Sequence, residues 1–332
     1  MKPKIAIDVG SSYTKIYKSR ADVVLFEPTC IALKNKNYKS PVAYGLDAYA
    51  LIGKTPENVE VIFPVNNTEI KDFKALVVLL EYFIKKIKKP FEIISSALLS
   101  VQCGSNHAII KNFENALIGA KIYNVCFAES PLLSLLGSGV ELSYETPNAV
   151  IDFGGGQVTV CVLTQAGVIS GASIEYGGNE LNKLIVKHLE ETLNLQISLH
   201  SAEIVKTQLA SLDADDETKS VINGKDVMTG KQRVHQISAC DIYEPVKAYV
   251  DKVLTVANAI FSSLQPETLN ELSKNGILLV GGGVNIYALS DYVFERLGIK
   301  AQVLEEAEIS SIIGAGKLVE NTELLEKLKL KA

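Results

Sequence analysis

The chain has 332 residues, which is more than one ordinary hydrophobic core supports, so its length predicts two domains. Hydrophobic residues make up 47% and charged residues 21% of the chain, a composition typical of globular proteins and unlike that of disordered ones. The net charge of −5 argues against nucleic acid as the main partner, because duplex binding requires a basic surface. No apolar run approaches the roughly 20 residues of a membrane span, and no signal peptide precedes the first predicted strand. We therefore expect a cytoplasmic protein.

Two groups of predicted strands open the two halves of the chain, and helices follow each group. β-Branched residues between turn residues mark the strands, and apolar residues spaced by three and four mark the helices. The predicted strands are 4–9, 14–18, 23–26, 29–34, 148–153, 158–163, 168–175 and 277–280. The predicted helices are one within 66–89, capped by Asn67 or Thr68 and stopped by Pro90, and others near 106–120, 129–137, 179–193, 201–212, 241–264, 286–297 and 310–328.

Strands followed by helices, repeated once, predict two α/β lobes of similar plan. The first lobe is 1–145, with a core of 1–32 and 66–145 and a small insert at 33–65. The second lobe is 146–332, with a core of 146–180 and 241–332 and a small insert at 181–240. The second insert contains two hairpin signals, Asn223-Gly224 and Thr229-Gly230.

A motif of strand, aspartate and glycine turn occurs once in each lobe. In "KIAIDVGSS" Asp8 ends an apolar run and Gly10 follows, and in "AVIDFGGG" Asp152 precedes Gly154 in the same way. A tight turn between strands exposes backbone N–H groups, and glycine lets the backbone approach phosphate oxygens. A plain hairpin with an aspartate cap explains one copy equally well, but two matching copies favour a binding device.

The residues around these turns have the chemistry of a phosphate–metal site. Ser11, Ser12 and Thr14 carry hydroxyl donors, and Lys15 carries an ammonium group that can meet a β- or γ-phosphate. Mg²⁺ prefers carboxylate and water oxygens, so the aspartates of the two motifs are the predicted metal-binding residues.

A third glycine cluster, Gly281, Gly282 and Gly283, follows the predicted strand 277–280. A bare backbone at this place suits a nucleoside, although a structural turn accounts for the pattern equally well. The cluster lacks the GxGxxG spacing of dinucleotide-binding proteins, and no acidic residue follows at the distance expected for a ribose contact.

The three glycine clusters, in this order, resemble the phosphate-1, phosphate-2 and adenosine motifs of the actin/Hsp70/hexokinase superfamily. Within that group the chain is most similar to MreB, the bacterial actin, almost from end to end. The stretches "SIEYGGNELNKLIVKHLEETLNLQISLHSAEIVK", "VINGKDVMTGKQRVHQIS" and "SSIIGAGKLVE" resemble the MreB helix pair, hairpin insert and closing helix. This resemblance implies an actin-like α/β fold, with two RNase H-like lobes, each with a small insert, around a nucleotide cleft.

The resemblance also implies the ligand and its contacts. The ligand is ATP with Mg²⁺, with GTP left open, and Asp8 and Asp152 serve the metal. Glu203 and Lys206 approach the ribose and base, and the third glycine cluster lies on the other side of the nucleotide. The implied cofactor-binding residues are Gly10, Ser11, Ser12, Tyr13, Lys15, Gly154, Gly155, Gly156, Gln157, Gly178, Glu203, Lys206, Gly281, Gly282 and Gly283.

The chain departs from MreB where MreB positions the attacking water. MreB has Glu-Glu-Pro before an Ala-rich helix, and its second Glu orients this water, whereas here Glu129 remains and Ser130 stands beside the proline. Gln157 replaces a threonine of the phosphate-2 turn, and Lys15 stands where conventional actin has a phosphate-contacting lysine. Glu129, Gln157 and Ser130 are the candidate catalytic residues, and slow or weakened ATP hydrolysis is expected.

These features predict a nucleotide-dependent cytoskeletal protein that forms homopolymeric filaments, with cell shape as the related process. The alternative is a PilM- or FtsA-like adaptor that binds nucleotide and recruits partners at the membrane. A small-molecule kinase of the superfamily needs an aspartate base in the first lobe, and no aspartate lies between Asp72 and Asp152. An Hsp70-type chaperone needs a longer chain.

A basic and apolar tip is predicted where the helix within 66–89 ends. Lys85, Lys86, Lys88 and Lys89 precede Pro90 and Phe91. In MreB the corresponding loop touches the membrane, which would place the protein peripherally at the inner face of the cell membrane. A solvated helix end, where lysines favour the C-terminal dipole, is the alternative explanation.

Overall fold

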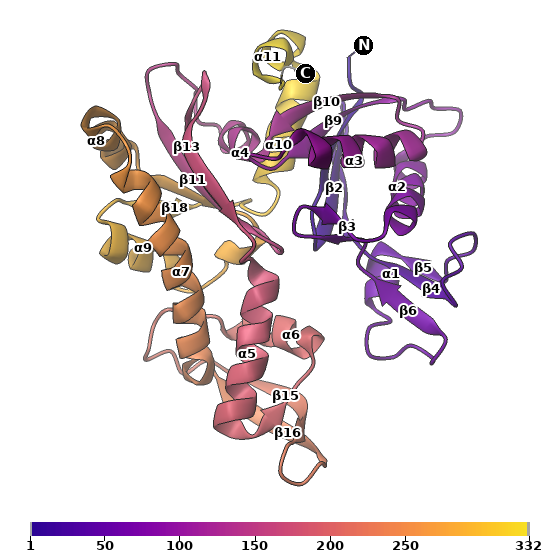
Figure 1. Cartoon of the computed structure of the whole chain (residues 1–332), viewed down its shortest axis with the longest axis vertical. Coiled ribbons are helices and arrows are strands. Elements are labelled where there is room, and N and C mark those ends of the chain that lie inside the picture. Colours follow the sequence, from indigo (N-terminus) through magenta and orange to yellow (C-terminus); the bar gives the residue numbers. More distant parts are fainter. Residues whose placement is uncertain (1, 331–332) are drawn as a thin grey trace. The chain divides into compact units, whose positions relative to one another are not determined.

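The computed structural model describes residues 2–330, and its contacts divide the chain into two compact units. Unit 1 contains Met1–Glu145, Leu163–Ile169 and Glu308–Ala332, and unit 2 contains Thr146–Val162 and Ser170–Ala307. Each unit is built on a five-stranded sheet with helices packed against it (Figure 1).

The sheet of unit 1 has the order β10-β9-β1-β2-β3. β1 (Ile5–Val9), β2 (Tyr13–Lys18) and β3 (Asp22–Pro28) form an antiparallel meander. β9 (Ser96–Val101) and β10 (Asn124–Glu129) extend the sheet parallel to β1. The carboxyl ends of β1, β9 and β10 therefore lie at one edge of this sheet.

Helices cover both faces of this sheet. α2 (Phe73–Ile87) and α3 (His107–Gly119) pack their apolar side chains into the same core as Ile16 of β2. Alternate residues of a strand point to opposite faces, so Tyr17 faces the other side, where its ring lies against Gly316 of α10 (Ser310–Glu320). α4 (Ser130–Gly137) packs against α10, and α11 (Thr322–Leu328) follows after a cap by the Asn321 side chain.

A small subdomain is inserted after β3. Its sheet has the order β5-β4-β6, from β4 (Ile31–Lys34), β5 (Ala43–Tyr44) and β6 (Val59–Ile62), with α1 (Gly45–Tyr49) beside it. The two-stranded pair β7 (Val65–Asn66) and β8 (Glu69–Ile70) leads back to α2.

The sheet of unit 2 repeats the plan of unit 1. Its order is β13-β12-β11-β17-β18, from β11 (Asn148–Phe153), β12 (Val158–Thr164), β13 (Gly167–Ile174), β17 (Ile277–Val280) and β18 (Ala301–Val303). In both sheets the first strand of the unit is central, its two meander successors lie on one side, and two later strands lie on the other. β17 is parallel to both β11 and β18, as β9 is to β1 and β10.

The core of unit 2 is formed by this sheet and by helices that bury their apolar faces. These helices are α5 (Gly178–Leu193), α6 (Leu199–Leu209), α7 (Tyr243–Ser262), α8 (Pro266–Asn275) and α9 (Leu289–Leu297). A small sheet of order β14-β15-β16 lies beyond α6, from β14 (Leu195–Gln196), β15 (Lys219–Asp226) and β16 (Gln232–Ser238). Short 3₁₀ turns at Cys240–Ile242 and Gly282–Val284 complete the unit.

Several predicted boundaries were wrong. Asp72, whose side chain accepts from the N–H of Ala75, caps α2 in place of Asn67 or Thr68, because the β7–β8 pair occupies those earlier residues. Asn223-Gly224 lies inside β15, paired with Val234 and Arg233, so only the later turn signal marks the hairpin. α8 was not predicted, and the closing helix is divided at Asn321.

The final segment also differs in its unit from the predicted division. The sequence assigned it to the second lobe, whereas Glu308–Ala332 belongs to unit 1, because α10 packs on β1, β2 and α4.

α4 and α10 approach each other through backbone atoms. A Cβ atom added at Gly314 would lie 1.8 Å from the carbonyl oxygen of Leu133, and one added at Gly137 would lie 1.9 Å from that of Ser310. Neither distance is possible without a shift of a helix, so both positions require glycine.

We expect Gly314→Ala to lower the free energy of unfolding by about 3 kcal/mol, because the added methyl group has to push two backbones apart. The matched control is Gly282→Ala, since a Cβ atom there would have no neighbour within 4 Å. Chemical denaturation of the two variants without added nucleotide measures the difference. Equal stability of both variants would show that the two helices separate at little cost.

Candidate functional site

Two acidic residues lie at the edge where the parallel strands of unit 1 end. Asp8 is near the end of β1, and Glu129 is the last residue of β10. Ligands of α/β sheets bind outside the carboxyl ends of parallel strands, so this edge is the candidate site of unit 1.

The carboxylate of Asp8 is held by its own unit. Asp8 and Lys15 are opposite each other on β1 and β2, and the Lys15 Nζ atom lies 3.5 Å from Asp8 Oδ2. Ser311, in the first turn of α10, donates its hydroxyl hydrogen to the same oxygen at 2.9 Å. The Lys15 ammonium also lies 5.8 Å from the centre of the Phe26 ring. These contacts fix a carboxylate and an ammonium group side by side.

The two predicted turns have the same geometry. The N–H of Gly10 donates to the carbonyl of Tyr13 at 3.0 Å, and the N–H of Gly154 donates to that of Gln157 at 3.0 Å. A Cβ atom would lie 2.9 Å from the Tyr13 oxygen in the first turn and 2.8 Å from the Gln157 oxygen in the second. Glycine is therefore required by the tight reversal itself, once in each unit.

The other residues of the first turn differ in what they can offer to a ligand. The hydroxyl hydrogen of Ser11 is already used within the protein, since it is donated to the carbonyl of Asn67 at 3.0 Å. Thr14 is fully buried and shares a hydrogen bond with Thr29, so its predicted role as a donor to phosphate was wrong. Ser12 is half-buried, and Tyr13 is exposed with its ring edge against Phe26.

The second turn is held by the start of α5. The N–H of Gly178 donates to the carbonyl of Gly154 at 3.0 Å, and the N–H of Asn179 donates to that of Gly155 at 2.8 Å. The N–H of Gly177 donates to the carbonyl of Gly156 at 3.2 Å. The carbonyl groups of the turn are thereby turned toward α5.

Gln157 carries a buried donor without an acceptor. Its side chain is 7% exposed, and its Nε2 atom has no hydrogen-bond partner among the described residues. A buried amide N–H that lacks a partner costs about 1–3 kcal/mol, so such a group in a glycine turn indicates an acceptor supplied from outside the chain.

Glu203 and Lys206 lie next to this turn, as predicted residues of the same site. Lys206 Nζ is 2.7 Å from Glu203 Oε2 and donates to the carbonyl of Gly178 at 3.2 Å. Asn182 Nδ2 donates to the same Glu203 oxygen at 2.6 Å. α5 and α6 together thus place a carboxylate, an ammonium and an amide group beside Gly178.

The third glycine cluster lies beside Asp152. β11 and β17 are parallel neighbours with Asp152 opposite Val280, so Gly281 follows at the same edge of the sheet. Gly281 has a φ of +91°, and a Cβ atom there would lie 2.4 Å from Asp152 Oδ1. Gly282 faces open space, and a Cβ atom at Gly283 would lie 2.9 Å from that of Phe153. A side chain at Gly281 would therefore collide with the half-buried Asp152 carboxylate, so glycine is required beside this acid.

Glu129 is chemically unlike an ordinary surface glutamate. Burial raises its pKa, and a hydrogen bond from the backbone of Gly104 opposes this effect. Ser130 begins α4 and is buried, with Pro131 following it. A carboxyl group with a raised pKa at a strand end is a candidate proton acceptor.

Each unit has groups that suit a phosphate and a carboxylate that suits Mg²⁺. Unit 1 has the turn 10–13, Lys15 and Asp8, and unit 2 has the turn 154–157, the Gln157 amide and Asp152. Within residues 2–330 no cluster of three or more His, Cys, Asp or Glu side chains could hold a metal ion alone. Mg²⁺ is commonly bound through one or two carboxylates together with phosphate oxygens and water, so single aspartates suffice.

The structure brings the predicted site residues together within each unit. Unit 1 gathers Asp8, the turn 10–13 and Lys15, and unit 2 gathers Asp152, the turn 154–157, Gly178, Glu203, Lys206 and the third glycine cluster. Two contact residues were missed by sequence reasoning, Ser311 and Asn182, because nothing in the spacing of a single serine or asparagine on a helix distinguishes it from others.

Across residues 2–330, no helix combines the length and apolar character needed to cross a bilayer.

Comparison with known proteins gives consistent matches over the whole chain. The family model described as MreB/Mbl protein matches residues 2–327. The cell shape-determining protein Mbl of Bacillus subtilis is 26% identical over 98% of this chain and 98% of its own. The crystal structure of MreB5 of Spiroplasma citri bound to ADP is 25% identical, with a TM-score of 0.90 over 97% of each chain. The MamK double helical filament structure is 19% identical, with a TM-score of 0.79 over 96% of this chain and 98% of its own.

These matches confirm the predicted resemblance and the predicted actin-like fold. The chain belongs to the MreB/Mbl family of actin-like, cell shape-determining proteins.

Proposed function

We propose that this protein binds ATP with Mg²⁺ and polymerises into cytoskeletal filaments, with slow hydrolysis of the nucleotide. The observation that carries the proposal is the pair of turns with the same geometry, each following a strand whose second-last residue is an aspartate. The ADP bound to MreB5 supports nucleotide binding, and the filament formed by MamK supports self-association. GTP remains a second candidate nucleotide.

The proposed phosphate-binding role rests on a positive charge and on a hydrogen-bond donor that lacks an acceptor in the protein. Lys15 supplies a positive charge, and the orphan Gln157 amide supplies a hydrogen-bond donor that gains its acceptor when phosphate is bound. The glycine turns admit phosphate oxygens close to the backbone. Mg²⁺, held with the help of Asp8 and Asp152, would neutralise the phosphate charge.

Hydrolysis requires a group that orients water and accepts its proton. Glu129 is best suited to this role among the candidate catalytic residues, because burial raises its pKa and makes it a stronger base than an exposed carboxylate. Ser130 has a neutral hydroxyl where a second carboxylate stands in MreB. The Glu129 carboxyl group alone is therefore left to orient the water and to accept its proton. We propose slow turnover for this reason.

The tip after α2 is proposed to bind an anionic membrane surface. Phe91 is 103% exposed and Ile93 72% exposed, and Lys85, Lys88 and Lys89 are exposed around them. The tip is held in shape by the buried Lys18, whose Nζ atom donates to Ile87 O at 2.9 Å and to Glu92 Oε2 at 2.6 Å. Lys86 has a different role, since it pairs with Glu27. Two exposed apolar side chains that follow three exposed lysines in the sequence match an interfacial anchor.

We expect ATP with Mg²⁺ to produce sedimentable filaments, and protein without nucleotide to stay in the supernatant. Asp152→Asn should weaken affinity for Mg-ATP by about 10- to 100-fold, because the neutral amide no longer attracts the metal. Pelleting and titration of a fluorescent ATP analogue measure the two effects. The same pelleting with GTP identifies the preferred nucleotide. Nucleotide binding without sedimentation in any condition would favour the non-polymerising adaptor instead.

Phosphate release should fall on acidification, beginning at a higher pH than the pKa of an ordinary glutamate. The reason is that the raised pKa keeps the Glu129 carboxyl protonated, and therefore unable to accept a proton, at pH values where exposed glutamates are ionised. Glu129→Gln should lower the rate about 100-fold and remove this pH dependence, with little change in nucleotide affinity. The exposed Glu141→Gln serves as control. An unchanged rate and pH profile in Glu129→Gln would exclude Glu129 from the reaction.

Replacing Phe91 and Ile93 together by alanine should reduce binding to vesicles of anionic lipid by at least about 10-fold, because most of the insertable apolar area is removed. Phe294→Ala, which removes an exposed aromatic ring of α9, is the matched control. Vesicle co-sedimentation measures the bound fraction. If the double variant and the control bind alike, the tip is only a solvated helix end.

A further inference from the structure

Ser311 contacts the candidate metal-binding carboxylate of unit 1, although no sequence pattern identifies it. Its side chain is 6% exposed, and its hydroxyl donates to Asp8 Oδ2 at 2.9 Å. Lys15 Nζ reaches the same oxygen at 3.5 Å, from the opposite residue of β2. Both contacts of the carboxylate thus go to Oδ2, and Oδ1 accepts no hydrogen bond from any residue between 2 and 330.

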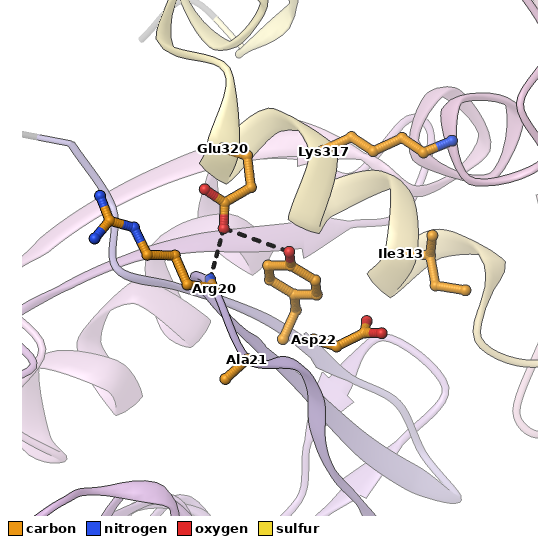
Figure 2. Close-up of a pocket in the computed structure, with 7 residues that line it drawn as sticks. Arg20, Ala21, Asp22, Ile313, Lys317 and Glu320 are labelled. Carbon is orange, nitrogen blue, oxygen red and sulfur yellow. Dashed lines mark hydrogen bonds between the residues drawn. The ribbon is translucent and has the colours of Figure 1, made fainter.

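α10, which carries Ser311, is anchored against β2 at its other end. Glu320 accepts hydrogen bonds from the backbone N–H of Arg20 at 2.8 Å and from the Tyr17 hydroxyl at 3.4 Å. Figure 2 shows Glu320 of the helix beside Arg20. These residues line an open pocket of about 690 Å³ between the β2–β3 turn and α10. Glu320 and Lys317, which belong to this pocket, are used to hold the helix, and we assign the pocket no ligand.

A third anchor joins α10 to α4. Lys317 Nζ donates to the carbonyl of Leu136 at 2.6 Å, at the C-terminal end of α4. The close backbone contact at Gly137 and Gly314 adds to this attachment. A helix held in this way cannot slide along the sheet, so the Ser311 hydroxyl has a fixed place relative to β1.

We propose that Ser311 is a positioning residue for Mg²⁺ binding: its hydroxyl, together with Lys15, fixes the Asp8 carboxylate so that Oδ1 stays free for the metal and its water. The proposal rests on the proposed function, since it assigns Asp8 to Mg²⁺. A carboxylate held through one oxygen loses little rotational freedom when the other is engaged, and such supporting hydrogen bonds tune metal affinity.

A purely structural serine predicts a different outcome. If Ser311 only satisfies a buried carboxylate, its loss lowers stability and affects nucleotide binding equally with and without Mg²⁺. If it positions Asp8 for the metal, its loss acts on the Mg²⁺ dependence alone. The two roles are therefore separated by a magnesium titration.

The test compares wild type with Ser311→Ala, Ser311→Thr and Ser134→Ala. Ser134, a buried serine of α4 whose Oγ has no partner among the described residues, is the matched control for removal of a hydroxyl group. Binding of a fluorescent ATP analogue is measured over a range of MgCl₂ concentrations and in EDTA, and thermal unfolding of each variant is recorded. We expect the Mg²⁺ concentration for half-maximal binding to rise about 10-fold in Ser311→Ala only, with affinity in EDTA unchanged and Ser311→Thr close to wild type.

Each contrary result has a distinct meaning. An unchanged Mg²⁺ dependence in Ser311→Ala, or an equal loss of affinity in EDTA, overturns the assignment of Ser311 while leaving the proposed function intact. If Ser311→Ala does not fold, Ser311→Thr decides, and a raised Mg²⁺ requirement in that folded, hydroxyl-bearing variant counts against the proposal. A wild-type protein that binds no nucleotide in either condition overturns the proposed function, and the role of Ser311 with it.

Discussion

A tight chain reversal, which begins two residues after an aspartate near the end of a strand, is the constraint on which the rest of this structure depends. In each unit a glycine N–H closes the turn onto the carbonyl three residues later, at 3.0 Å. The reversal places the next strand antiparallel to the first and leaves the aspartate at the sheet edge. The pairing of the first two strands and the position of the acid beside a close backbone turn both follow from this one arrangement, which the chain uses twice.

The two turns are supported in different ways, although their local geometry is the same. The first is attached to the β7–β8 pair through Ser11 and Asn67, and its acid to α10 through Ser311. The second is attached to the start of α5 through three backbone hydrogen bonds. The turn of unit 1 thus depends on side chains that evolution can exchange, whereas the turn of unit 2 depends mainly on the backbone. Lys15 and Ser311 are two such side chains, and both contact Oδ2 of Asp8.

The features that the sequence predicted well are those that local physics determines. The repeated Asp–Gly pattern gave the central hairpin of both sheets, because only glycine permits the close turn. The N-cap of α2 was misplaced since Asn67, with a φ of +55°, serves the short β7–β8 turn instead of a helix. Asn223-Gly224 reads as a turn but lies in a strand, where Gly224 packs closely against Leu195.

Some contacts between residues far apart in sequence were not predicted. Ser311 and Asp8 are separated by 303 positions, and their hydrogen bond exists only because α10 returns to the first sheet. Because α10 packs on the first sheet, the final segment belongs to unit 1 and not, as the sequence had predicted, to the second lobe. The orphan donor of Gln157 and the raised pKa of Glu129 likewise depend on burial, which a linear pattern does not reveal.

The meeting of α4 and α10 at Gly137 and Gly314 has a consequence for how this family member can change over time. Each glycine faces a main-chain carbonyl of the other helix, not a side chain. An ill-fitting side chain in a core is commonly accommodated when its neighbour becomes smaller, but a peptide group has no smaller version. A substitution at a neighbouring residue therefore cannot directly compensate for the loss of either glycine. We expect both positions to stay glycine as the sequence of the protein diverges.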